Sequence, residues 1–186
     1  MRKIIVFNSI SLDGYFTDQS GDMSWAHKND PEWNEFIAGN SKGEATFLFG
    51  RVTYQMMASW WPSEQAIKTM PEVANAMNNQ SKIVFSRTLK EATWSNTRLI
   101  NDNLIDEVRK LKSDSVEDIL IFGSGTIVSQ LTQEGLIDEY QLVINPIVLG
   151  KGRTMFEGLK DKLVLKRTQS RTFDNGNVFA CYVPVS

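Results

Sequence analysis

The chain has 186 residues, with 20 lysine and arginine side chains against 22 aspartate and glutamate side chains, and a formal net charge of −2. This near balance gives no general attraction to nucleic acid or anionic lipid, so an anionic ligand has to be bound by local chemistry. Hydrophobic residues make up 41% of the chain, which is typical of a globular protein. No linker-like stretch divides it, and we expect one domain over residues 1–186.

The sequence also limits the compartment and the kinds of partner. The first apolar run ends at Asn8, too early for a signal peptide, and no stretch approaches the length of a transmembrane span. The single cysteine, Cys181, cannot form an internal disulfide and lies in an apolar alternation that predicts a buried thiol. His27 is the only histidine, which excludes a multi-histidine metal site. We expect a cytoplasmic protein with no metal, no membrane partner and no nucleic-acid partner.

Strands and helices alternate along most of the chain, judged by apolar runs and by apolar residues at helical spacing. In chain order the sequence predicts a strand at 3–10, a helix at 31–39, a strand at 46–49, a helix at 51–59, strands at 82–85 and 98–100, a helix at 103–111, a strand at 118–122, a helix at 126–133 and a strand at 139–145. Two further strands at 163–173 and 178–183 flank residues 174–177, Asp-Asn-Gly-Asn, which is a hairpin signature.

This order of elements predicts the fold class. Helices between strands imply a mainly parallel sheet with right-handed crossovers, and the closing hairpin adds antiparallel strands, so the fold is α/β with a mixed sheet. Ligands of such sheets bind outside the carboxyl ends of the strands. A homodimer through a sheet edge near residues 142–148 is plausible. In the helix at 51–59 we expect Val52, Met56 and Met57 to face the sheet.

Three predicted strands end in a small or cationic corner, at residues 47–51, 83–87 and 119–125. Where a helix follows a strand, unpaired backbone N–H groups and the positive end of the helix dipole point to one spot, where a phosphate can sit. Gly123 and Gly125 leave room for a pyrophosphate, although a tight strand-to-helix turn is the simpler explanation of that motif alone. Residue 128 is Val, so the third glycine of a Rossmann fingerprint is missing.

Two of the corners carry an arginine. Arg51 lies at a predicted helix start, where the helix dipole disfavours a cation, so an anion such as a ribose phosphate would compensate. A solvated arginine on a helix end explains this residue equally well. Arg87 repeats the pattern beside Ser86, and the two corners together favour NADPH over NADH.

The helix at 31–39 offers a candidate acid. It begins with Asp30 as N-cap and a proline at the first helical position. Glu35 shares a face with Glu32 and lies close to the apolar flank of Phe36, where partial burial would favour its protonated form. Most such glutamates are simply solvated.

Four of the five tryptophans fall in the first third of the chain. Core packing is the default explanation for them. The sharper alternative is that a flat heteroaromatic ligand stacks on one or two, with Trp25 and Trp60 as the candidates and Glu32 and Phe36 beside them as further substrate contacts.

Taken in order, these motifs resemble the dihydrofolate reductase superfamily, and more specifically a bacterial branch similar to the C-terminal reductase domain of riboflavin-biosynthesis proteins. The matching segments are 11–14 (Ser-Leu-Asp-Gly), 48–54 (Leu-Phe-Gly-Arg-Val-Thr-Tyr), 85–89 (Phe-Ser-Arg-Thr-Leu), 123–125 (Gly-Ser-Gly), 135–139 (Gly-Leu-Ile-Asp-Glu) and 146–152 (Pro-Ile-Val-Leu-Gly-Lys-Gly). The resemblance covers nearly the whole chain. It implies a dihydrofolate reductase-like three-layer fold, with a mixed, mainly parallel sheet and a C-terminal antiparallel hairpin.

The resemblance also implies NADPH as the cofactor. According to this resemblance, the cofactor phosphates would be held by Gly50, Arg51 and Thr53, and the adenosine 2′-phosphate would be approached by Ser86 and Arg87. The pyrophosphate and nicotinamide side would be lined by Gly123, Ser124, Gly125 and Thr126, and the nicotinamide would be flanked by Ile10 and Ser11. Residues 21–25 are similar to the family's Gly-Asp-Leu-Pro-Trp segment. Residues 34–36 resemble the helix that carries the folate-site acid, which favours Glu35 over Asp30 and Glu32.

The resulting hypothesis is an NADPH-dependent oxidoreductase that transfers hydride to a C=N or C=O bond of a small heterocycle, either a pterin or a ribosylated pyrimidine. Glu35 or a bound water would supply the proton. Two alternatives are a non-catalytic nucleotide-binding or small-molecule-binding module and a flavin-linked reductase.

Overall fold

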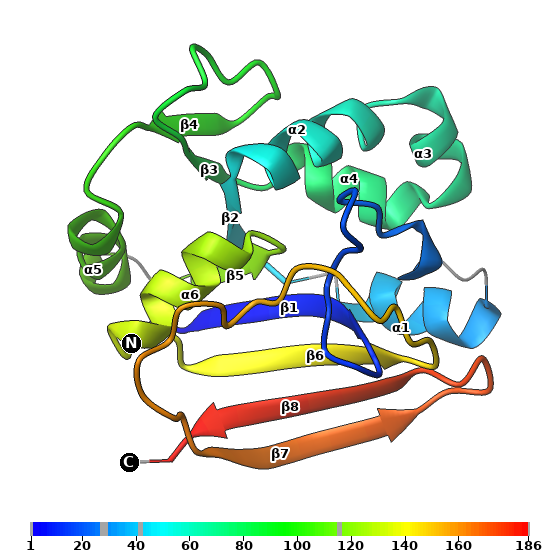
Figure 1. Cartoon of the computed structure of the whole chain (residues 1–186). Coiled ribbons are helices and arrows are strands. Elements are labelled where there is room, and N and C mark those ends of the chain that lie inside the picture. The colour runs from blue at the N-terminus through cyan, green and yellow to red at the C-terminus, as the bar shows by residue number, and fades with distance from the viewer. Residues whose placement is uncertain (1, 27–29, 41–42, 115–116, 186) are drawn as a thin grey trace.

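The computed structural model describes residues 2–26, 30–40, 43–114 and 117–185 (Figure 1). Its strands are β1 (Ile4–Ser11), β2 (Ala45–Gly50), β3 (Lys82–Phe85), β4 (Thr97–Ile100), β5 (Asp118–Phe122), β6 (Glu139–Asn145), β7 (Leu165–Thr172) and β8 (Val178–Pro184). Its helices are α1 (Pro31–Asn40), α2 (Arg51–Trp60), α3 (Glu64–Thr69), α4 (Pro71–Asn79), α5 (Leu104–Asp114) and α6 (Gly125–Gln133), with a single 3-10 turn η1 (Ser24–Ala26) among the described residues.

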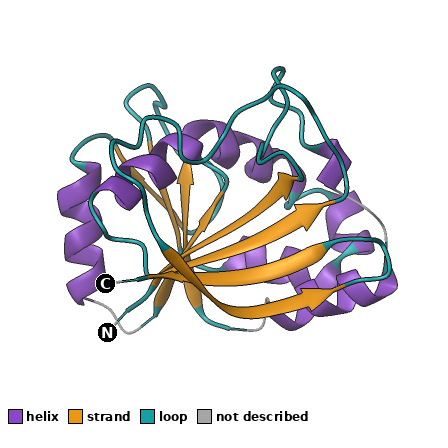
Figure 2. Ribbon diagram, turned by 60° about the horizontal axis from the view of Figure 1, so that its bottom comes forward, coloured by secondary structure: helices purple, strands orange, loops and turns teal. Residues whose placement is uncertain are grey.

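The strands form one eight-stranded sheet in the order β4-β3-β2-β5-β1-β6-β8-β7. The neighbours from β4 to β6 pair in parallel, whereas β8 pairs antiparallel with both β6 and β7. Figure 2 shows this twisted sheet with helices on both sides. The predicted α/β fold, with a mixed, mainly parallel sheet and a C-terminal hairpin, is therefore confirmed.

The topology corrects one expectation about the edges of the sheet. Strand β6 lies between β1 and β8, so it is an interior strand. A dimer contact through a sheet edge near residues 142–148 is therefore wrong, because the edge strands in the described part of the chain are β4 and β7. A homodimer formed through another surface stays a prediction.

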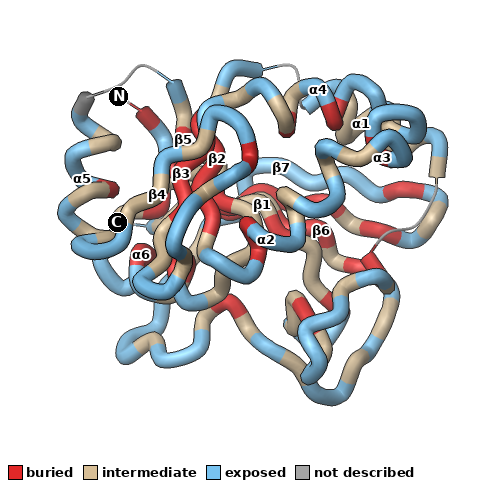
Figure 3. The backbone as a smooth tube through the Cα atoms, turned by 90° about the horizontal axis from the view of Figure 1, so that it is seen from above, coloured by how far each residue is buried: buried red, intermediate tan, exposed pale blue. Residues whose placement is uncertain are grey.

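Two apolar clusters cover the two faces of the sheet, so the central strands are apolar on both sides. On one face, α5 and α6 place Val108, Val128 and Leu131 against β1, β2 and β5. On the other, Tyr54 from α2 and Met77 from α4 pack with residues of β2 and β3. Figure 3 shows the buried segments concentrated in these central strands.

Helix α2 has a different rotation from the one expected. Val52 is 61% and Met56 38% exposed, so the prediction that they face the sheet is wrong; Met57 is partly buried against the core. The buried residues of α2 are Thr53 and Tyr54. The hydroxyl of Tyr54 accepts a hydrogen bond from the backbone N–H of Trp94 at 2.9 Å, which satisfies its polar end inside the core.

Residues 64–79 form two helices that the sequence analysis did not predict. Ser63 caps α3 by accepting a hydrogen bond from the N–H of Ala66, and α4 begins with Pro71 at its first position. At the end of α4, the buried side chain of Lys82 donates to the carbonyls of Met77, Asn78 and Gln80 at 2.7 to 3.0 Å. These bonds place a cation at the negative end of the α4 dipole.

Two local expectations hold. Asp30 is the cap of α1, because its carboxylate accepts a hydrogen bond from the N–H of Trp33 at 2.8 Å. Cys181 is buried, and this burial raises the pKa of its thiol to about 11. No described helix has both the length and the apolar character needed to cross a membrane.

Candidate functional site

The carboxyl ends of β2, β5 and β1 lie side by side in the middle of the sheet, and the turn after β5 leads from the middle one of the three into α6. In this turn Gly123 and Ser124 both have a φ of 57°, in the left-handed region, and α6 begins at the next residue. For serine this conformation costs about 1–2 kcal/mol. The turn therefore needs compensating bonds to hold Ser124 in place.

Those bonds come from the junction of β2 and α2. The Ser124 hydroxyl accepts a hydrogen bond from the N–H of Gly50 at 2.7 Å and donates to the hydroxyl of Thr53 at 3.2 Å. A Cβ at Gly123 would lie 2.7 Å from the Thr53 hydroxyl oxygen, so only glycine fits there. The starts of α2 and α6 are thus tied together at one corner, which brings together Gly50, Thr53 and Ser124, three residues that the sequence analysis assigned to the cofactor.

Asn8 holds the same turn from β1, and the sequence analysis missed it. Its side-chain carbonyl accepts from the N–H of Gly123 at 2.7 Å, and its side-chain NH₂ donates to the carbonyl of Gly123 at 3.3 Å. The same NH₂ lies 2.7 Å from the sulfur of Met155. An asparagine inside an otherwise apolar strand was the available signal, because a buried amide needs polar partners.

The two helix starts leave backbone donors free of side-chain caps. Neither Gly50 at the start of α2 nor Ser124 at the start of α6 makes a side-chain cap bond. The N–H groups of the first turns and the positive dipole ends of both helices therefore lie near this corner. Arg51 is exposed and donates to the side chain of Gln55 at 3.0 Å, so its guanidinium lies on the helix surface beside these donors. Such an arrangement suits phosphate oxygens.

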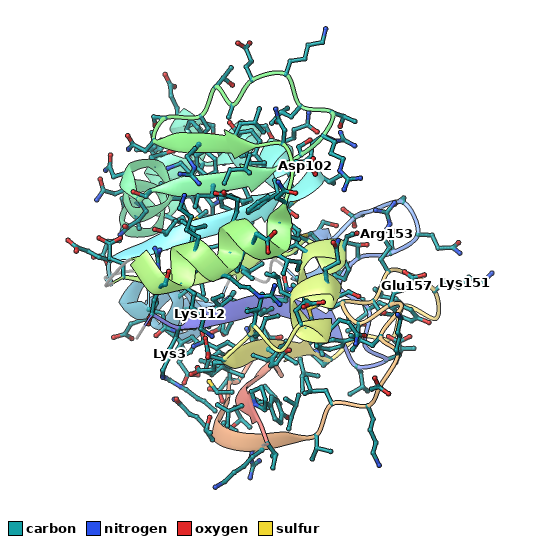
Figure 4. The ribbon with its side chains drawn as sticks, turned by 90° about the vertical axis from the view of Figure 1, so that its left-hand side faces the viewer. Lys3, Asp102, Lys112, Lys151, Arg153 and Glu157 are labelled. Carbon is teal, nitrogen blue, oxygen red and sulfur yellow. The ribbon has the colours of Figure 1, made fainter. Side chains whose placement is uncertain are left out.

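The corner after β3 is built differently, because no helix follows it. The Ser86 hydroxyl accepts hydrogen bonds from the N–H groups of Thr88 and Leu89 at 3.2 and 2.9 Å. The Arg87 side chain is 85% exposed and lies 3.9 Å from the carboxylate of Asp102, which is labelled in Figure 4. An exposed pair of this kind is worth about 0–1 kcal/mol, so the guanidinium can change partner at little cost.

The loop after β1 is fixed to the connection between β6 and β7. The carboxylate of Asp13 accepts from the N–H groups of Leu149 and Gly150 at 3.1 and 2.7 Å. A hydrogen bond from the Ser11 hydroxyl is the main reason why the pKa of Asp13 lies below its usual range, and the two backbone bonds add to this. Thr17 and Arg153 continue this pairing as a β-bridge. Figure 4 shows Arg153 on this connection, near α6.

At the end of β1 itself, Ser11 is fully buried and Ile10 partly buried. The N–H of Ser11 donates to the carbonyl of Tyr15 at 2.8 Å, and its hydroxyl accepts from the N–H of Tyr15 at 3.0 Å. The predicted nicotinamide-flanking residues therefore lie on the strand that the turn of Gly123 adjoins.

Helix α1 lies on the opposite side of β1 from α6 and packs on the hairpin of β7 and β8. The rings of Trp33 and Phe36 lie 5.0 and 5.2 Å from the ring of Phe173. Glu32 forms an ion pair with Arg171 at 2.9 Å. Glu35 is exposed, so the partial burial expected for it is wrong. The reason is its position, about 200° around the helix from Trp33.

The two candidate stacking tryptophans lie apart from the phosphate corner. Trp25 is partly buried in η1, where its indole N–H donates to the carbonyl of Asp22 at 3.3 Å. Trp60 is 44% exposed at the far end of α2, roughly 13 Å along the helix from Arg51 at 1.5 Å per residue. The structure therefore brings the predicted phosphate residues together and leaves the predicted substrate residues spread over α1, α2 and η1.

The described residues contain no group of three or more histidine, cysteine, aspartate or glutamate side chains placed to hold a metal ion. His27 lies outside the described residues.

Comparison with known proteins places this geometry in a family. The model of the RibD C-terminal domain matches residues 2–179. The chain belongs to the RibD C-terminal domain family. The suspected resemblance is thereby confirmed, since the match spans nearly the whole chain.

One relative and two solved structures show how close this similarity is. The uncharacterized protein YyaP of Bacillus subtilis (strain 168) is 31% identical over 182 residues, covering 97% of this chain and 94% of YyaP. A protein from Shewanella sp. PV-4, solved as a candidate riboflavin biosynthesis protein, is similar with a TM-score of 0.77 and 24% identity, covering 99% of each chain. Dihydrofolate reductase from Enterococcus faecalis gives a TM-score of 0.65 at 12% identity, covering 99% of this chain and 97% of that enzyme. The fold is therefore that of the dihydrofolate reductase-like reductases.

Proposed function

We propose that this member of the RibD C-terminal domain family is an NADPH-dependent reductase of a small heterocycle, with a pterin and a ribosylated pyrimidine as the candidate substrates. The observation that carries the proposal is the Ser124 tie between the starts of α2 and α6. It holds two uncapped helix N-termini at one corner, which suits the pyrophosphate of a dinucleotide. The similar dihydrofolate reductase of Enterococcus faecalis was solved in complex with NADP(H), which supports the same class of cofactor.

The residues at the corner fit such a cofactor. The close approach at Gly123 leaves no room for a side chain between the turn and α2, so backbone groups face the ligand. We assign the cofactor phosphates to Gly50, Arg51 and Thr53, with Gly123 to Thr126 along the pyrophosphate and nicotinamide side. Ser86 and Arg87 are assigned to the adenosine 2′-phosphate, and Ile10 and Ser11 to the nicotinamide.

When bound, NADPH supplies a hydride that adds to the carbon of a C=N or C=O bond, while the nitrogen or oxygen of that bond takes a proton. Glu35, which is exposed on α1, is the proposed source of this proton, either directly or through a bound water. Glu32 and Phe36 on α1, with Trp25 and Trp60, are the proposed substrate contacts. Of these, Glu32 binds through a carboxylate that already pairs with Arg171.

Calorimetric titration of the purified protein with NADPH and NADH tests the cofactor. We expect NADPH to bind at least about tenfold more tightly, because a hydrogen bond to a charged group contributes about 1.5–3 kcal/mol and a tenfold change in affinity needs only about 1.4 kcal/mol. Following the loss of nicotinamide absorbance with pterins and pyrimidines then tests the reaction. Absence of heat with NADPH would refute the proposal.

Turnover separates the alternatives. Tight NADPH binding without oxidation by any pterin or pyrimidine would identify a binding module, and a yellow colour on purification would identify a flavin-linked reductase. Glu35→Gln tests the acid, with Glu64→Gln on exposed α3 as the matched control. A catalytic Glu35 predicts a lower kcat in the first variant and an unchanged kcat in the second.

A further inference from the structure

A row of three buried polar residues crosses the sheet at the ends of β1, β6 and β8. Strand register pairs Ser11 with Asn145, and it pairs Ile144 with Val178, which places Asn177 opposite Asn145 at the next step. Ser11 and Asn145 are fully buried, and Asn177 is 1% exposed. Their alternation puts them on the sheet face of Val143 and Phe179, which is the face that α1 covers.

Three side-chain amide atoms of this row lack hydrogen-bond partners. The side-chain NH₂ of Asn145 donates to the carbonyls of Ile10 and Val143, but its oxygen accepts no hydrogen bond. Both polar atoms of the Asn177 side chain are buried and unpaired. In the adjoining turn the oxygen of Asn175 accepts from the N–H of Asn177 at 2.9 Å, while its NH₂ is buried without a partner.

These atoms are concentrated in one place. Of the five unpaired buried side-chain polar atoms in the part of the chain that the structure describes, four belong to Asn145, Asn175 and Asn177. A buried amide without a hydrogen bond destabilises a fold, and buried polar groups are normally paired. Two acceptors and two donors gathered at this end of the sheet and in the adjoining turn therefore indicate a group that bonds to them in the working protein.

The location connects this row to the site already described. Asn145 bonds to the carbonyl of Ile10, a residue assigned to the nicotinamide side. The closing pair of the hairpin joins Phe173 to Asn177, and Phe173 carries the ring contacts of Trp33 and Phe36 from α1. The row is thus bordered by aromatic rings on one side and by the end of β1 on the other.

Such surroundings select a particular kind of ligand. A primary amide presents a donor and an acceptor side by side, and its complement is a ring in which an N–H lies beside a C=O, which is a lactam edge. Aromatic side chains suit the flat faces of such a ring. A cation or a phosphate fits poorly, because the row offers neutral donors and acceptors together.

We propose that Asn145 and Asn177 bind the lactam edge of the heterocyclic substrate and so fix which ring the protein accepts. This rests on the proposed reductase function and assigns recognition of the substrate ring to these two residues. Because the amide atoms are buried, the ring reaches them when the cover of Trp33 and Phe36 shifts, and binding then shields the reacting bond from water.

Asn177→Leu is the decisive variant, because both amide atoms of Asn177 are unpaired and leucine has a similar volume. We expect the melting temperature without ligand to stay the same or rise, since the change removes buried polar atoms that have no partner. The shift in melting temperature caused by NADPH should be unchanged. The shift caused by a dihydropterin or an aminouracil should disappear, with affinity at least tenfold weaker.

Two controls sharpen the test. Asn78→Leu removes an amide whose NH₂ donates to the carbonyl of Trp61 and whose oxygen accepts from the indole of Trp94, both at 2.9 Å. It should lower the melting temperature and leave both ligand shifts intact. A diaminopyrimidine, which has no lactam edge, should give no shift with the unaltered protein.

Asn177→Ser serves if the leucine variant does not fold, because it keeps a polar group and still deletes the amide. The inference is overturned if either variant keeps the lactam-induced shift, if Asn177→Leu lowers the melting temperature as Asn78→Leu does while the ligand still binds, or if no lactam shifts the unaltered protein. The NADPH-induced shift of the unaltered protein reports separately on the proposed function.

Discussion

Ser124→Ala tests whether the tie between α2 and α6 stabilises the site corner. The change removes a hydroxyl that accepts from the N–H of Gly50 at 2.7 Å and donates to Thr53 at 3.2 Å. Gly50 is partly buried, so its N–H loses a partner without gaining full access to water. A lost hydrogen bond of this kind costs about 1–2 kcal/mol. For a chain of this length that corresponds to a fall in melting temperature of roughly 2–8 °C.

Ser124→Gly gives a second, independent magnitude. It loses the same hydroxyl but relieves the left-handed conformation, in which φ is 57°. That relief is worth about 1–2 kcal/mol, and the greater freedom of glycine in the unfolded chain offsets about 0.4–1 kcal/mol of it. We therefore expect Ser124→Gly to be more stable than Ser124→Ala by roughly 1 kcal/mol.

Equilibrium unfolding in urea measures both variants, with Thr53→Val as the control. Thr53→Val deletes the longer of the two bonds and keeps the bond between Gly50 and Ser124. Its loss should be smaller than that of Ser124→Ala. Equal urea midpoints for the alanine and glycine variants would refute the claim that the left-handed conformation of residue 124 is strained. A Ser124→Ala variant as stable as the wild type would refute the claim that the hydroxyl of Ser124 stabilises the corner.

Three further outcomes follow from the same structure. Arg87→Gln should reduce the preference for NADPH over NADH by about tenfold in calorimetric titrations, whereas Arg167→Gln on the exposed edge strand β7 should not change it. Burial lowers the pKa of Lys82 from 10.5 to about 8, so the folded chain binds fewer protons than the unfolded chain between these values. Thermal stability should therefore rise as the pH increases above about 8, and Lys82→Met should lose this rise; an unchanged slope would contradict the shift. Gly152→Ala should abolish folding or cost several kcal/mol, because its Cβ would overlap the carbonyl of Thr17, whereas Gly39→Ala in α1 meets no atom and should stabilise by about 0.5–1 kcal/mol.

The strand ends of the site could be predicted from the sequence because parallel strands bring their carboxyl ends to one edge. Apolar runs ending at Gly50 and Phe122 were enough to bring these two corners together. The tie through Ser124 could not be predicted, since it depends on a serine in the left-handed conformation. Residues other than glycine rarely adopt this conformation. Asn8 was missed for a related reason: its two bonds to Gly123 join residues 115 positions apart.

Helices α3 and α4 carry start signals in Ser63 and Pro71, but the interior of α4 has a weak local preference for helix. Helix α4 contains three asparagines, Asn75, Asn78 and Asn79, and asparagine is a poor helix former. Its stability comes instead from the burial of Val73 and Met77 against the sheet. The local helix propensity of α4 was therefore too low to predict a helix that tertiary packing stabilises.

The rotation of α2 shows a limit of apolar periodicity. Val52, Met56 and Trp60 recur every four residues and form one apolar face, but all three are substantially exposed. Tyr54 packs in the core instead, where its hydroxyl accepts a hydrogen bond from the N–H of Trp94. The amphipathic pattern therefore predicted the wrong face of α2 to be buried.

The proximity of Asn145 and Asn177 in the buried polar row could not be predicted from the sequence. Asn145 reads as the last residue of a strand and Asn177 as part of a hairpin turn, and both are ordinary places for asparagine. Only the antiparallel register of β6 and β8 makes them neighbours, since a slip by one residue would turn one side chain to the opposite face. The register is fixed by the apolar pairs further along, such as Val143 with Phe179, and not by the amides themselves. Apolar packing elsewhere in the hairpin therefore keeps these unpaired amides adjacent, although their own contacts do not favour it. This arrangement is expected where the fold supplies the stability and a bound ligand supplies the missing hydrogen bonds.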